Sequence, residues 1–115
     1  MNLFGLSVLW IKNSLGLTLE VIAGKCGTHK GYVSGWIHGS VNPPSPSVIK
    51  RIAKAYGPKM RFTYEELLEI SWVCKAPKDI RTRECRRVVN GSEMIRRIVR
   101  DLSITSDVLG RAVSS

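Results

Sequence analysis

The residues whose types could support metal binding or catalysis are concentrated in one stretch, CGTHKGYVSGWIHG, from position 26 to 39. Cys26, His29 and His38 could act as zinc ligands, but they lack a fourth ligand and no Cys-x-x-Cys pair accompanies them. Cys26 has no nearby base or carboxylate to activate it as a nucleophile. The glycines follow no strand and lack the Gly-Lys-Ser/Thr ending of a phosphate-binding loop. We therefore expect a buried Cys26, histidines that face solvent or phosphate, and a protein that is not an enzyme and has no metal or cofactor.

The charge balance of the chain is strongly positive. Among 115 residues, 18 are Lys or Arg and 9 are Asp or Glu, so the formal net charge is +9. This excess favours a polyanionic partner, either a nucleic acid or an anionic membrane surface. The length and the 43% hydrophobic content predict one globular domain, with room for an appended segment.

The N-terminal segment and the cysteines bear on location. The segment MNLFGLSVLWIKNSLG is apolar, but it has neither a leading basic region nor an Ala-x-Ala cleavage site. Lys12 and Asn13 interrupt it too early for a membrane span. Three cysteines, an odd number at no characteristic spacing, fit a reducing compartment. These features predict a cytoplasmic protein with no membrane association.

Apolar residues at helical spacing predict an all-α protein, because no run alternates with period two for long enough to form a strand. The first expected helix covers residues 3–14. The second covers 19–25, is capped by Thr18 and buries Val21 and Ile22. A turn at Gly27 follows.

Three further helices are expected before position 73. One starts at position 28 or 29 and is ended by Gly39 in a left-handed conformation. The prolines of VNPPSPS, 41–47, place this stretch in a loop, so Ser47 caps a fourth helix that Gly57-Pro58 stops. Thr63 and Glu66 form a capping box that opens a fifth helix through position 70 or 72.

A short helix, a turn at Gly27 and a second short helix are the parts of a helix-turn-helix, whose second helix lies in the DNA major groove. From about position 3 to 71 the chain resembles the Cro/lambda-repressor-like (XRE) family. The resemblance implies a five-helix, lambda-repressor-like DNA-binding domain over residues 1–72. It rests on the order and spacing of Thr18, Ala23, Gly27, Thr28, Val33-Ser34, Trp36, Gly39, Asn42-Pro43 and the segment IKRIAKAYG at 49–57.

The resemblance also implies which residues contact DNA, by their positions on and around the third helix. Lys30 is expected to bind a base edge, most simply guanine O6 or N7. Gly31 and Gly35 carry no side chain and let the helix approach the groove closely, and Tyr32 lies against the sugar-phosphate or a thymine methyl. The full expected set is Thr18, Thr28, His29, Lys30, Gly31, Tyr32, Ser34, Gly35, His38, Ser40, Asn42 and Ser45.

The chain departs from the family pattern at two places near this helix. Leu19 stands where the family often has Gln, which helps to hold the backbone and the recognition side chain. Ile37, followed by His38, stands where the family often has Glu. The departures and the two glycines predict weaker sequence-specific readout by this helix alone.

Residues 73–115 lie outside the resemblance and are expected to form a basic helical extension. The segment SEMIRRIVRDL, 92–102, is amphipathic, with one apolar stripe opposite three arginines. Two interpretations stay open: the stripe packs on the fifth helix, or it is a dimer contact, since proteins of this family usually bind two-fold operators as dimers. Position 106 or 107 is expected to cap a last short helix.

The combined prediction is a cytoplasmic transcriptional regulator of the prophage or mobile-element type. It is expected to be a repressor that binds a palindromic double-stranded DNA operator as a homodimer. Two alternatives remain: the antitoxin of a toxin–antitoxin pair, whose tail binds a toxin, and a protein-interaction module that no longer binds DNA. Either alternative implies a protein partner, such as a toxin or an antirepressor.

Overall fold

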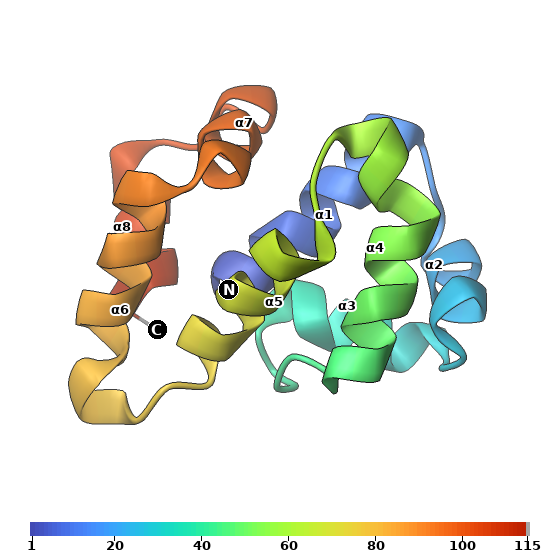
Figure 1. The fold of residues 1–115 in the computed structure, drawn as a ribbon, viewed down its shortest axis with the longest axis horizontal. Coiled ribbons are helices and arrows are strands. Elements are labelled where there is room, and N and C mark those ends of the chain that lie inside the picture. The colour runs from blue at the N-terminus through green and yellow to red at the C-terminus, as the bar shows by residue number, and fades with distance from the viewer. Residues whose placement is uncertain (115) are drawn as a thin grey trace.

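A computed structural model describes residues 1–114 and confirms the all-α prediction, because these residues form eight helices and no strand. The five helices expected before position 73 are present, and three more follow them (Figure 1). The fifth helix ends at Cys74, so the domain boundary that the sequence predicted between residues 72 and 73 falls inside this helix. In chain order the helices are α1 (Leu3–Leu15), α2 (Leu19–Cys26), α3 (Lys30–His38), α4 (Pro46–Met60), α5 (Tyr64–Cys74), α6 (Lys78–Gly91), α7 (Glu93–Asp101) and α8 (Ser106–Ser114).

Helices α1 and α5 lie in the middle of the molecule and connect two groups of helices. Figure 1 shows α2, α3 and α4 on one side of them and α6, α7 and α8 on the other. Helix α1 contacts α3, α5 and α7, while α5 contacts α4 and α6. One continuous cluster of buried apolar side chains includes residues from all eight helices. The C-terminal extension therefore packs onto the same core as the first five helices.

The ends of the first three helices follow directly from their sequences. The Thr18 hydroxyl accepts a hydrogen bond from the Val21 N–H at 3.2 Å and caps α2. Gly16, Gly27 and Gly39 follow α1, α2 and α3 with φ of +62°, +70° and +77°. Only glycine adopts this left-handed conformation without strain, so each helix ends where its glycine stands. The predicted turn at Gly27 and the left-handed end of the third helix at Gly39 are confirmed, while α1 and α2 each end one residue later than predicted.

The predicted burial of Val21 is wrong, since this side chain is 46% exposed. Ile22, Ala23 and Cys26 are the buried residues of α2. At 100° per residue these three share one face of the helix, and Val21 lies outside it. Its apolar side chain is therefore part of the surface near the start of α2.

The predicted limits of the fourth helix are also wrong. Helix α4 begins at Pro46, whose missing N–H is unimportant at the first helical position. It then runs through Gly57-Pro58 to Met60, although Pro58 has no N–H to donate to the carbonyl of Lys54. Gly57 is required for a different reason. A Cβ at this position would lie 2.6 Å from the Phe62 carbonyl oxygen, which folds back over the helix end.

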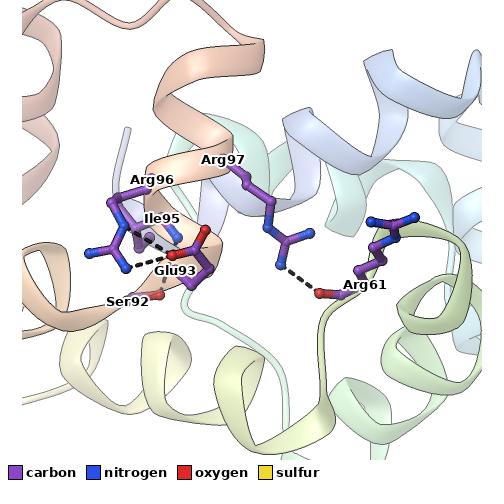
Figure 2. Close-up of polar contacts among 6 residues, drawn as sticks. All are labelled: Arg61, Ser92, Glu93, Ile95, Arg96 and Arg97. Atoms are coloured by element: carbon purple, nitrogen blue, oxygen red, sulfur yellow. Dashed lines mark hydrogen bonds and ion pairs between the residues drawn. The ribbon is translucent and has the colours of Figure 1, made fainter.

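Arg61 follows the last residue of α4 and caps it with a left-handed φ of +58°. The Phe62 N–H donates to the Gly57 carbonyl at 3.1 Å, which closes the turn. The Arg97 guanidinium in α7 donates to the carbonyl oxygen of Arg61 (Figure 2). It also donates to the carbonyl oxygen of Met60. A side chain from the extension therefore stabilises the end of α4, which explains why a non-glycine residue can hold this conformation.

The apolar stripe of the amphipathic segment is buried within the chain. Met94, Ile95 and Ile98 are at most 2% exposed, and α7 packs mainly against α1 and α6. The Trp10 indole N–H in α1 donates to an Asp101 carboxylate oxygen at 2.9 Å, which fixes the end of α7. The predicted packing of the stripe on the fifth helix is thus wrong, because α7 packs mainly against α1 and α6. The burial of these three side chains also leaves them unavailable for the predicted dimer contact.

Candidate nucleic-acid interface

Helix α3 has one buried face and one exposed face. Val33, Trp36 and Ile37 are at most 7% exposed, and the Trp36 ring meets the Phe4 ring of α1 edge-on, with centroids 6.1 Å apart. These contacts hold α3 on the core and fix which of its residues face outward. The expected DNA-binding residues of this region that reach the surface are His29, Lys30, Gly31, Tyr32, Ser34 and His38, with Ser34 half-buried.

His29 organises the start of α3. Its Nδ1 accepts a hydrogen bond from the Gly31 N–H at 3.2 Å, so the imidazole caps the helix and carries its proton on Nε2. The imidazole also lies against the Tyr32 ring, with centroids 4.6 Å apart. A Cβ on Gly31 would come within 3.0 Å of the His29 ring. The glycine thus gives room to the capping histidine, and the free Nε2–H can donate to a phosphate or a base.

Lys30 is paired in this structure with a residue that the sequence prediction did not include. Its Nζ lies 3.4 Å from an oxygen of Glu20, and both side chains are about two-thirds exposed, at 67% and 65%. Hydrogen bonds from its own backbone and from Lys30 lower the pKa of Glu20. An ion pair this exposed is weak and can open without a large cost. Glu20 therefore connects the first turns of α2 and α3 next to the position where the family often has Gln.

Gly35 is not part of the exposed face, so its predicted approach to DNA is wrong. It is buried, and a Cβ at this position would lie 2.4 Å from a methyl carbon of Val41. The amide groups of Ser40 and Val41 both donate to the Gly35 carbonyl, at 3.0 and 3.3 Å. These bonds fold the chain after Gly39 back over the end of α3. Gly35 thus makes room for this loop.

The loop between α3 and α4 places its predicted residues on the surface. Ser40, Asn42 and Ser45 are exposed, and Thr18 is exposed at the start of α2. A groove of about 280 Å³ separates this loop from the start of α3, and Asn42 is among the residues that line it, together with Thr28 and Tyr32. The structure therefore brings Asn42 close to Thr28 and Tyr32 at the start of α3.

The geometry does not bring the candidate zinc ligands together. Cys26 is buried, and burial raises the pKa of its thiol to about 11. His29 and His38 are exposed at opposite ends of α3. Within residues 1–114, no group of three His, Cys, Asp or Glu side chains is placed to hold a metal ion.

The electrostatics of this half of the molecule come from a long acid-free segment. Residues 21–64 contain no Asp or Glu, while they include Lys25, Lys30, Lys50, Arg51, Lys54, Lys59 and Arg61. Sequence reasoning counted the total charge and missed this distribution, which a simple scan for acidic residues would have found. The segment includes α3, α4 and the turn between α2 and α3, so the predicted interface lies in a continuously basic part of the chain.

Comparison with known families supports the same region. The sequence profile described as "Helix-turn-helix" matches residues 8–59, which contain α2, α3, the loop after α3 and most of α4. Comparison with curated proteins and with solved structures finds no match. Residues 8–59 therefore belong to the Cro/lambda-repressor-like (XRE) helix-turn-helix family, and the protein is a DNA-binding transcription regulator of this type.

Domains of this family are generally not enzymes, and they act by binding DNA. Regarding membranes, no single helix within residues 1–114 has the length and apolar character to cross a bilayer. Helices α1 and α2 meet these two criteria only as a pair, and the pair is bent by 115°.

Proposed function

We propose that the protein is a repressor that binds a palindromic operator as a homodimer, with α3 in the major groove. The observation that carries this proposal is the exposed face of α3, which contains Lys30 and Tyr32 within an acid-free, basic segment. An α-helix fits the major groove of B-DNA, and Lys is suited to the O6 and N7 acceptors of guanine. On DNA, Lys30 leaves Glu20 and turns toward a base edge.

The rest of the interface positions the helix and reads no sequence. Thr18 at the start of α2, Thr28 and His29 before α3, and the exposed loop residues lie where phosphate contacts would flank the groove. Residues 1–72 make all these contacts in our proposal. Residues 73–114 hold α1 and the end of α4 in place.

The proposed dimer needs a surface other than the apolar stripe of α7, which is buried. Trp72 on α5 is 56% exposed and is the most exposed of the large apolar side chains in residues 1–114. Exposed tryptophans are enriched at protein–protein interfaces. We therefore place Trp72 in the dimer contact, so that two copies present their α3 helices to two half-sites about one helical turn apart.

Footprinting tests this proposal. The purified protein is bound to a pool of random duplexes, the tightest sequences are selected, and the protected bases are mapped. Two symmetric half-sites are the expected result. Lys30→Ala should change the preferred base at one position in each half-site by roughly 1–3 kcal/mol of discrimination. Trp72→Ala should leave half-site contacts in place but make the protein monomeric in sedimentation equilibrium. A Lys30→Ala protein with unchanged affinity and preference would contradict the assignment of α3 to the groove.

A further inference from the structure

We propose that Lys25, Arg51 and Lys54 form a phosphate-binding cluster that grips the DNA backbone beside the major groove occupied by α3. This inference rests on the proposed function, because it requires a duplex on α3. The three cations come from α2 and α4 and, with Ala55, line one surface depression of about 390 Å³. The cluster lies outside the residues that the family resemblance assigns to DNA.

The turn of the helix-turn-helix positions the cluster. A Cβ on Gly27 would lie 2.5 Å from Nη1 of Arg51, so the absent side chain lets the guanidinium lie directly against this turn. Gly27 also borders the groove that contains Thr28 and Tyr32. The cluster is therefore adjacent to the start of α3, on the side of the turn that faces α4.

The three cations of the cluster have no carboxylate partner, unlike several other basic residues of the chain. Within residues 1–114 every ion pair involves a cation that lies outside the cluster. In addition, positions 21–64 contain no acidic residue. Three like charges around one depression repel one another in the free protein. An anion bound between them removes this repulsion, and its binding is favoured for that reason. The paired cations are Lys30, Arg87, Arg96 and Arg100.

The arrangement of the cluster along α4 suits a DNA strand. Ser47, Arg51 and Lys54 are exposed and occupy positions i, i+4 and i+7, which share one face of a helix. This face spans roughly 10 Å at 1.5 Å per residue. Phosphates of one strand are spaced about 3.4 Å along the duplex axis, so the face can meet two or three of them. It also continues from Ser45 and the loop that is proposed to contact phosphate, so the same strand can follow both.

The test compares two variants with the same change in net charge. In the first, Lys25, Arg51 and Lys54 are replaced by Gln. In the control, the exposed residues Lys59, Lys75 and Lys78, which lie outside the cluster, are replaced by Gln. The dissociation constant for a 30-bp duplex of mixed sequence is measured by fluorescence anisotropy between 50 and 400 mM NaCl, and thermal melting monitored by circular dichroism checks that both variants fold.

The expected result is a smaller salt dependence for the cluster variant alone. Each lost phosphate contact reduces the slope of log affinity against log salt by about 0.9, so three contacts account for about 2.7. If both proteins bind equally at 1 M salt, the cluster variant should bind the duplex more weakly than the original protein, on the order of 100-fold, near 0.15 M salt. The control variant should keep a slope close to that of the original protein.

Three outcomes would overturn the inference. Equal effects of the two variants would show that total charge determines affinity. An unchanged slope in the cluster variant, together with normal half-site footprints, would reject the phosphate-binding role of this cluster and leave the proposed function intact. Absence of any duplex binding by the wild type would reject the proposed function together with the inference.

Discussion

Gly5 lies where α1 crosses the last turn of α3, and we predict that Gly5→Ala destabilises the protein. A Cβ built on Gly5 would lie 2.5 Å from the Trp36 carbonyl oxygen and 2.6 Å from that of Ile37. Both atoms belong to the backbone of α3, so neither can rotate away. Because real Cβ contacts are essentially never shorter than 3.0 Å, the two helices would have to separate by roughly 0.5 Å at their crossing.

The size of the effect follows from two opposing terms. Alanine is favoured over glycine in a helix by about 1 kcal/mol, whereas forcing an extra methyl into a packed contact typically costs about 1–3 kcal/mol. Two backbone clashes place Gly5→Ala at the upper end of this range. We expect the free energy of unfolding to fall by about 2 kcal/mol, and the melting temperature by about 8 °C for a domain of this size.

Gly24→Ala is the matched control. Gly24 lies in α2, is exposed, and has no atom within 4 Å of an added Cβ beyond its own helix. Here only the helix propensity changes, so the free energy of unfolding should rise by about 0.5–1 kcal/mol. Urea unfolding of both variants, followed by tryptophan fluorescence, measures the difference. If Gly5→Ala proved as stable as Gly24→Ala, the close approach of α1 to the carbonyls of α3 would be refuted.

Three other predictions follow from contacts described above. Glu20→Gln frees Lys30 and removes a negative charge next to α3, so duplex binding should tighten roughly two- to fivefold in anisotropy titrations; weaker binding would mean that Glu20 orients Lys30 for DNA. Asp101→Ala leaves the Trp10 indole N–H without its acceptor and should lower the melting temperature. The hydrogen bond from Trp10, and after it the one from Arg100, lowers the pKa of Asp101 in the folded protein. The Asp101 carboxylate therefore stabilises the fold fully above the ordinary aspartate pKa, and this stabilisation is lost as the pH falls through the lowered pKa of the folded protein. Melting temperatures of the two proteins should therefore converge in acid, and a constant difference down to the lowest pH would argue against this. Thr63→Ala breaks the capping box of α5 and should reduce the free energy of unfolding by about 1 kcal/mol in urea titrations, while an unchanged midpoint would show that the cap contributes nothing.

Those parts of the fold that depend on local contacts could be predicted from the sequence. Thr18 and Gly27 determine the limits of α2 through bonds to residues at most five positions away, and Thr63 does the same for the start of α5. The end of α4 could not be predicted in this way. It depends on Arg97, which donates to the carbonyl of Arg61 across 36 positions of sequence, and no local rule identifies such a partner.

The candidate site shows the same division. The exposure of Lys30 and Tyr32 follows from helical spacing once Val33 and Trp36 are assigned to the core. The burial of Gly35 could not be foreseen, because it depends on the path of the following loop and on a methyl group of Val41. Nor could the partner of Lys30 be foreseen. Glu20 is ten positions away on another helix, and only the packing angle between α2 and α3 brings the two charges together.

The bond between Trp10 and Asp101 links residues 91 positions apart, and this separation constrains how the protein is made. During synthesis, α1 leaves the ribosome before α7 does, and its tryptophan has no acceptor until α7 has been translated. The hydrogen bonds from Arg97 to the end of α4 likewise form only after α7 has been translated. A nascent chain that has released only α1 to α5 therefore contains every residue proposed to contact DNA without the support that fixes their scaffold. We therefore expect fragments that end before residue 101 to bind DNA more weakly than the chain that includes α7.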